Sequence, residues 1–262
     1  MGLITSELLK ECKYPKEIQA LLDQAELAIN TWQKIWSPFL SAPVREEVLN
    51  LVMPISDLKC FSSGGFEGAE RHRICFMRNF DEDFLHKEPT PVLGLNVEGN
   101  FLFDNANVKD FRFNLEALGA YQEGLGDIWL IGDRGAQAIC SVEIANELNG
   151  KESLLRDVPI RFEKLEIYEL QTPVKRVPKK IRTVEASTRI DAISSAGFGL
   201  SRAKIVRKIK EGQLRLNWEQ VSNTSKSLIK GDLVQLENKG TIEITSMEPT
   251  KKQRWRIELM RK

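Results

Sequence analysis

The chain of 262 residues contains few of the residues and patterns on which common enzyme and metal sites depend. It has only two histidines, His72 and His86, and four cysteines, none of which forms a C-x-x-C pair. Structural zinc sites usually combine four such ligands, and hydrolase triads need a histidine base. The scarcity argues against a metal centre and against these hydrolases. Unpaired cysteines at irregular spacing are typical of reduced thiols in a cytosolic protein.

Long apolar runs are also absent. No stretch approaches 18 apolar residues, so we expect no membrane-spanning segment. The first residues, MGLITSELLKECKYPKE, contain early acidic residues and no apolar core of a secretory signal. We therefore expect a cytoplasmic protein, or a protein of the plastid stroma if the chain comes from a photosynthetic eukaryote.

The near-neutral net charge of +1 conceals a strong division of charge along the chain. Residues 172–262 hold 21 Lys and Arg against 9 Asp and Glu, a net charge of +12. Residues 1–171 hold the remaining 17 against 28, a net charge of −11. A strongly basic C-terminal third is the electrostatic signature of a phosphate-binding module.

Residues 1–85 are predicted to form a mainly helical N-terminal domain. Apolar side chains recur every three or four residues over 16–36, which predicts one amphipathic helix, and a second helix is expected from Pro43 to about residue 52. A glycine-rich stretch at 64–68 then precedes Arg71, His72 and Arg73. It is either a loop that approaches a ligand closely or a simple turn into a buried strand, but it lacks the closing residues of a P-loop.

Residues 86–171 are predicted to form an α+β domain of the ferredoxin or RNA-recognition-motif type. Strands are expected at 92–97, 127–131, 136–140 and 161–170, and helices at 111–122 and 142–148, which gives the order β-α-β-β-α-β. The aromatic run that stacks single-stranded bases in that fold is absent. We therefore expect a spacer or a protein-contact domain.

A basic linker is predicted over 172–186, where two prolines exclude a regular helix. Its cations are Lys175, Arg176, Lys179, Lys180 and Arg182. Beyond it, 187–262 is predicted to form the last domain, which ends in a β-hairpin of residues 241–247 and 254–259. Lys251, Lys252, Arg254 and Arg256 of this hairpin extend the positive surface.

The sequence of 189–239 predicts two short helices followed by strands. A break at 197–199 separates the helices, Ser201 is placed to cap the second, and Gly212 ends it. At 100° per residue, the apolar residues of the second helix fall on one side and its cations on the other. One side packs, and the other forms a row of positive charges, which on its own is also typical of a solvated helix face.

The motifs R-I-D, S-R-x-K, E-G-x-L-x-L-N and K-G-D in this stretch resemble the S4 RNA-binding domain. One departure is Trp218, where that family commonly has glycine after the asparagine. The resemblance implies that the helix beginning with Ser201 lies against structured RNA. The candidate RNA-binding residues are Arg189, Ser201, Arg202, Lys204, Arg207, Lys208, Lys210 and Arg215, with Lys179 and Lys180 of the linker.

Two further segments, GGFEGAERHRICF and LGAYQEGLGDIWLIGDRGAQAIC, resemble the YlmH family, whose cyanobacterial and plastid members are called photosystem II S4 domain proteins. The resemblance implies binding to 23S-type rRNA on the large ribosomal subunit, with tRNA as a further candidate, in ribosome-associated quality control. No cofactor, metal or catalytic residue is implied. Between residues 120 and 126 the chain is shorter than the family pattern and lacks its arginine.

Two alternatives remain open at this point. S4 domains also occur in RNA-modifying enzymes such as pseudouridine synthases, although no catalytic R-L-D stretch of the synthase type lies outside the S4-like module and no G-x-S-x-G motif is present. An adaptor would recruit a protein partner through the acidic N-terminal domains while RNA serves as the anchor.

Overall fold

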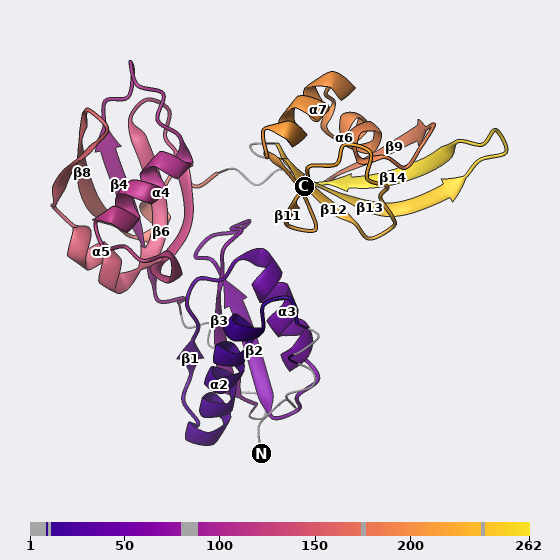
Figure 1. Ribbon diagram of the computed structural model, residues 1–262. Coiled ribbons are helices and arrows are strands. Elements are labelled where there is room, and N and C mark those ends of the chain that lie inside the picture. Colours follow the sequence, from indigo (N-terminus) through magenta and orange to yellow (C-terminus); the bar gives the residue numbers. More distant parts are fainter. Residues whose placement is uncertain (1–8, 10–11, 80–88, 174–176, 237–238) are drawn as a thin grey trace. The chain divides into compact units, whose positions relative to one another are not determined.

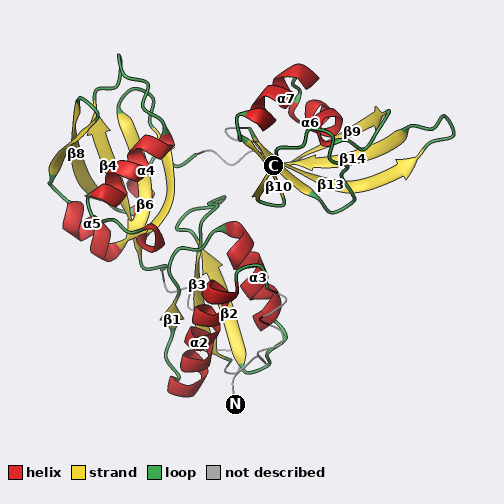
Figure 2. Cartoon of the chain, viewed as in Figure 1, coloured by secondary structure: helices red, strands yellow, loops and turns green. Residues whose placement is uncertain are grey.

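A computed structural model describes residue 9 and residues 12–79, 89–173, 177–236 and 239–262. The chain divides into two compact units, Met1–Pro173 and Val174–Lys262 (Figure 1), which we call unit 1 and unit 2. The boundary coincides with the change in charge, because no charged residue lies between 171 and 174. His86, Lys175 and Arg176 lie outside the described residues. The structure is mixed α and β, with a helical N-terminal region and several sheets, as predicted (Figure 2).

The N-terminal part of unit 1 packs two helices, α2 (Pro15–Thr31) and α3 (Ala42–Val52), on a small sheet. The sheet has the order β1-β3-β2 and consists of β1 (Ile35–Trp36), β2 (Leu58–Ser63) and β3 (Arg73–Arg78). The helix predicted over 16–36 is therefore too long. Trp32 adopts φ 62° and ends it, and Ile35 and Trp36 pair with β3 instead.

The rest of unit 1 is a five-stranded antiparallel sheet with two helices. Its elements are β4 (Val92–Gly99), α4 (Val108–Ala117), β5 (Leu125–Leu130), β6 (Gly135–Ser141), α5 (Val142–Leu148), β7 (Glu152–Leu155) and β8 (Val158–Leu165). The strand order is β5-β6-β4-β8-β7. The predicted β-α-β-β-α-β order is present, and β7 is an additional edge strand that the sequence analysis did not anticipate.

Both faces of this sheet are covered. Helices α4 and α5 pack on one face, where Phe111 and Leu115 meet strand residues such as Leu95. On the opposite face Val92, Trp129 and Ile139 form a second cluster with Phe39 and Leu170. RNA-recognition motifs leave that face open for stacked bases. Here the chain's own side chains cover that face, so this cluster is not open to stacked bases.

Buried polar contacts join the two parts of unit 1. Asp127 of β5 accepts hydrogen bonds from the backbone N–H groups of Glu70 (2.6 Å) and Arg71 (3.0 Å). The Arg71 guanidinium in turn donates to the carbonyl groups of Phe39, Gln122 and Leu125 at 2.9–3.0 Å. The cations that follow the glycine-rich stretch therefore fasten the fold rather than face a ligand.

Unit 2 consists of one six-stranded sheet and two helices. Its elements are β9 (Lys179–Glu185), α6 (Ile190–Phe198), α7 (Arg202–Lys210), β10 (Leu214–Leu216), β11 (Glu219–Gln220), β12 (Leu233–Leu236), β13 (Gly240–Pro249) and β14 (Trp255–Arg261). The strand order is β11-β10-β12-β13-β14-β9. The segment predicted as a linker thus supplies an edge strand, β9. No helix among the described residues is long and apolar enough to cross a membrane.

The two helices of unit 2 are separated by residues 199–201. Gly199 adopts φ 65° and caps α6, whereas Gly197 remains helical. A Cβ at Gly197 would stand 2.7 Å from the Ile242 side chain of β13, so glycine is required there for close helix–sheet packing. The break predicted at 197–199 therefore lies two residues later in the chain, and α6 packs directly against the sheet (Figure 1).

Candidate nucleic-acid interface

Helix α7 carries most of the predicted RNA-binding residues, and its N-terminus is fixed by Ser201. The Ser201 hydroxyl accepts a hydrogen bond from the Lys204 backbone N–H at 3.3 Å, so its role in the structure is a helix cap. Ile205 and Ile209 are buried in the core of unit 2, while Lys204, Arg207 and Lys210 are exposed on the other side. The division into an apolar and a cationic face is as predicted.

An acidic residue that was not among the predicted site residues organises the two most prominent arginines. Asp191, with only 3% of its surface exposed, accepts hydrogen bonds from Arg189 at 3.0 and 3.1 Å and from Arg202 at 2.8 Å. The arginine side chains are 40% and 55% exposed. One carboxylate therefore orients two guanidinium groups whose other edges face solvent. We call Arg189, Asp191 and Arg202 the arginine fork.

The charge states of the arginine fork are consistent with a carboxylate that orients two guanidinium groups. Burial alone would raise the pKa of the Asp191 carboxyl, but the hydrogen bonds from Arg189 and Arg202 outweigh it and hold that pKa below its ordinary value of 3.8. The carboxylate stays ionised at neutral pH. Two cations against one anion leave the fork with a net charge of +1 beside the start of α7. The aspartate of the R-I-D motif was the sequence signal that could have identified it.

The remaining cations of α7 differ in how far they are held by neighbours. Arg207 lies 3.6 Å from Glu211, and the Lys208 amine donates to Gln213 at 2.8 Å. Lys204 and Lys210 make no ion pair with another described residue. Such exposed side chains are suited to phosphate contacts that set position rather than read sequence.

Arg215 lies on β10, which follows α7 directly, and the turn after it is unusual. Asn217 (φ 48°) and Trp218 (φ 71°) are both left-handed, as a two-residue type I′ turn requires. Asn217 donates to the Asp232 carboxylate at 2.9 Å and accepts from the Leu233 backbone N–H at 2.8 Å. The turn thus keeps its form although Trp218 occupies a position that favours glycine.

Lys179 and Lys180 do not join the others, because β9 and β10 are separated by three strands of the sheet. The Lys180 amine pairs with Glu258 of β14 at 2.7 Å. Side chains alternate along a strand, and Ile181 packs into the core beneath α6, so Lys180 and Arg182 lie on the face away from the helices. By the same alternation Lys179 lies on the side of Ile181, and Arg215, between the buried Leu214 and Leu216, lies on the open face with Lys180. The predicted residues therefore do not form one surface of unit 2.

Outside the α7 face, we looked for metal-binding clusters and for reactive titratable groups in the part of the chain that the structure describes. No three His, Cys, Asp or Glu side chains gather there at metal-binding distances. Burial raises the pKa of the Asp127 carboxyl, but its contacts are those of a fastening group. Burial also raises the pKa of the Cys60 and Cys140 thiols to about 12, so both stay protonated and unreactive at neutral pH.

Comparisons with known proteins agree with the motifs. The family model described as "YlmH, N-terminal" matches residues 13–79, which include the whole of the segment GGFEGAERHRICF. The ribosome-associated protein quality control protein P2 of Bacillus subtilis (strain 168) is 26% identical over 254 residues, which cover 95% of this chain and 96% of that protein. Its name refers to ribosome-associated quality control and to no enzymatic activity.

A solved structure of the cell division protein ylmH from Streptococcus pneumoniae also matches. It has a TM-score of 0.48 and 15% sequence identity, and the match covers 61% of this chain and 94% of that one. The sequence relationship, which spans nearly the whole chain, is the stronger finding. The resemblance of this chain to the YlmH family is thereby confirmed.

Proposed function

We propose that this protein binds structured RNA of the large ribosomal subunit through unit 2, which acts as an S4-type module, and that it serves ribosome-associated quality control in the cytoplasm. The rRNA is the main ligand in this proposal, and a tRNA held on the subunit is a second RNA within reach. The relative from Bacillus subtilis supports the ribosomal setting. The function is binding rather than catalysis.

The observation that carries the proposal is the arginine fork at the start of α7. A guanidinium that is already oriented loses less conformational freedom when it meets a phosphate, and it can donate two parallel hydrogen bonds. The exposed cations of α7 continue the same surface, and unit 2 as a whole carries a net charge of +12. Together they form a positively charged surface that is partly pre-organised for an RNA backbone.

The test is cosedimentation of the full chain with purified large ribosomal subunits over a salt series. The variant Lys204→Gln/Arg207→Gln/Lys210→Gln removes three cations from the α7 face. Since each phosphate contact contributes about 0.7 to 0.9 to the slope of log K against log salt, we expect the slope to fall by about 2 to 3. Lys109→Gln/Lys151→Gln/Arg161→Gln removes the same charge from exposed sites of unit 1 and is the control, with an unchanged slope expected.

A second candidate function is that of an adaptor, and one feature of unit 1 favours it. Leu102, Phe103, Phe113 and Leu154 are 60%, 96%, 75% and 60% exposed. They lie on connected elements, because Arg156 bridges Asp104 and Asp110 at 2.6 and 2.9 Å and the Asn114 side chain donates to the Leu154 carbonyl. An exposed apolar group on an acidic unit suits a basic protein partner.

The adaptor function is tested by affinity capture with the full chain and with the variant Phe103→Ser/Phe113→Ser. Recovery of one specific basic protein by the wild type, with loss from the variant, supports the adaptor. Equal recovery by both forms contradicts it.

A further inference from the structure

The hairpin of β13 and β14 ends in an ordered turn that presents cations. The Thr250 backbone N–H donates to the Arg254 carbonyl at 2.7 Å, and the Arg254 N–H donates to the Thr250 hydroxyl at 3.1 Å. The Gln253 N–H donates to the Thr250 carbonyl at 3.0 Å, with Gln253 at φ 55°. These bonds close the turn on itself, so Lys251 and Lys252 extend from a fixed backbone.

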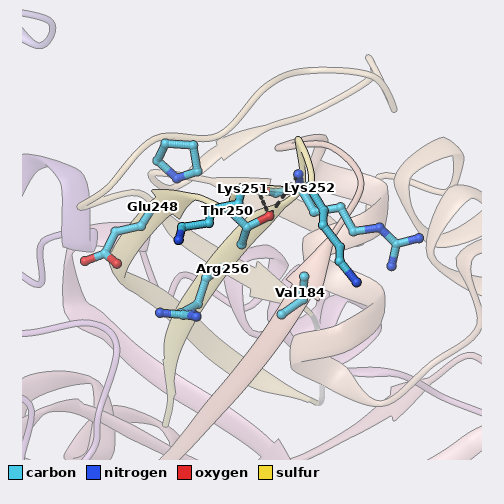
Figure 3. A pocket seen from close by; sticks show the side chains of 8 residues that line it. Val184, Glu248, Thr250, Lys251, Lys252 and Arg256 are labelled. Atoms are coloured by element: carbon cyan, nitrogen blue, oxygen red, sulfur yellow. Dashed lines mark hydrogen bonds between the residues drawn. The ribbon is translucent and has the colours of Figure 1, made fainter.

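The side chains of the turn and of the adjoining strands surround an open hollow of about 800 Å³ (Figure 3). Its charged lining comprises Lys251, Lys252, Arg254 and Arg256 against the single acid Glu248. Within the described part of the chain, none of these four cations makes an ion pair. Four unpaired cations around one hollow repel one another unless an anion lies between them. The arrangement is that of an anion site.

The hollow lies on the face of the sheet that the helices leave open. Arg256 pairs in register with Val184 of β9 and Glu248 of β13, and Val184 is 51% exposed. The neighbouring Ile257 is fully buried in the core, on the side covered by α6. Because side chains alternate, Arg256 points away from the helices. The hollow is thus a surface separate from the cationic face of α7.

The chemistry of the lining favours an extended polyanion over an acidic peptide. Arg254 directly precedes β14 and Arg256 lies in it, so the two residues are about 6.8 Å apart at the extended-chain advance of about 3.4 Å per residue. The two lysines of the turn line the same hollow, and Val184 and Pro249 are the only apolar residues of the lining. Such a lining offers many phosphate contacts and little apolar surface for the side chains of a peptide.

We propose that this hollow is a second phosphate-binding site, at which unit 2 holds the backbone of an RNA strand other than the segment that lies on α7. This inference rests on the proposed function, since it makes the RNA interface bipartite. Lys180 and Arg182 lie on the same open face, where both pair with Glu258, and they extend the positive surface toward the start of β9. Lys180, a predicted residue that does not join α7, thereby gains a role.

The experiment compares the wild type with Lys251→Gln/Lys252→Gln/Arg254→Gln in cosedimentation with large ribosomal subunits over a salt series. We expect the slope of log K against log salt to fall by about 2 to 3, and the losses to add to those of the α7 variant. The triple variant of unit 1 described above controls for net charge. If the wild type binds steeply and the hairpin variant has the same slope, the second site is refuted while the proposed function stands.

If the wild type does not bind the subunit, the proposed function fails, and the hollow is tested by a separate measurement. Backbone amide shifts of residues 250–254 in the full chain are followed during titration with a 12-nucleotide oligo(U) and with a 12-residue oligoglutamate. Saturable shifts with the RNA that greatly exceed those with the peptide support the site. Absence of shifts, or equal shifts with both probes, overturns it.

Discussion

The variant Asp191→Asn tests whether the arginine fork is organised by its carboxylate. The Asp191 side chain is 5% exposed and accepts three hydrogen bonds from Arg189 and Arg202. Hydrogen bonds to charged groups contribute about 1.5 to 3 kcal/mol each, but both arginines are about half exposed and regain water when released. We therefore expect a loss of about 2 kcal/mol in the free energy of unfolding of unit 2, read from hydrogen exchange of the α6 and α7 amides in the full chain.

The same change should weaken RNA binding although it makes the protein more positive. Two arginines that are no longer oriented must each be ordered on binding, at about 0.5 to 1.5 kcal/mol per side chain. We therefore expect a loss of about 5- to 150-fold in affinity for large ribosomal subunits. Glu211→Gln, which removes the acidic neighbour of Arg207, makes the same charge change on α7 and should bind as well as the wild type. Tighter binding by Asp191→Asn would mean that Asp191 only competes with RNA phosphates, which refutes this role.

Three further predictions concern stability. Trp218→Gly should stabilise unit 2 by about 0.5 to 1 kcal/mol, because relief of about 1 to 2 kcal/mol of left-handed backbone strain exceeds the entropy cost of glycine. A lower urea midpoint for the variant would show instead that the indole of Trp218 contributes packing. Asp127→Ala should destabilise unit 1 by about 2 to 4 kcal/mol in urea unfolding, since the backbone N–H groups of Glu70 and Arg71 lose their acceptor; a change under 1 kcal/mol contradicts the fastening role. Burial and then Arg45 lower the pKa of His72 below 6.5, so the unfolded chain takes up a proton that the folded chain does not. The contribution of His72 to the free energy of unfolding of unit 1 should thus be full above pH 6.5 and decrease as the pH drops below 6.5. His72→Gln should reduce this dependence of the unfolding free energy on pH. An unchanged dependence would mean that other groups cause it.

Local sequence signals predicted unit 2 well where they agreed with its tertiary packing. Ser201 caps α7, Ile205 and Ile209 face the core, and Gly212 follows the helix end in a left-handed conformation, as the pattern indicated. Alternation also placed Leu214 and Leu216 inside. Each of these features depends on a few neighbouring residues, which is why a single sequence reveals them.

The errors arose where distant contacts or unrecognised caps decide the structure. Periodicity extended the first helix to residue 36, but the strand pairing of Ile35 and Trp36 with β3 overrides it. The helix predicted over 111–122 begins at Val108, because Asn107 and Asp110 form a capping box that periodicity alone does not reveal.

The candidate site was predictable only in part for the same physical reason. The cations of α7 follow from the helical period, but Asp191 becomes the centre of the fork only when the start of α7 folds back beside α6. Similarly, Lys180 was expected to act from a flexible linker, whereas β9 pairs with β14 and carries it to the open face of the sheet. Nothing in the local pattern of 172–186 indicates that pairing.

Cosedimentation of the wild-type full chain with purified large and small ribosomal subunits, from about 50 to 400 mM salt, tests the central claim most directly. We predict binding to the large subunit that weakens log-linearly with salt, with a slope set by the phosphate contacts of unit 2, and no comparable binding to the small subunit. Absence of binding to the large subunit at the lowest salt, or equal binding to both subunits, would contradict the account.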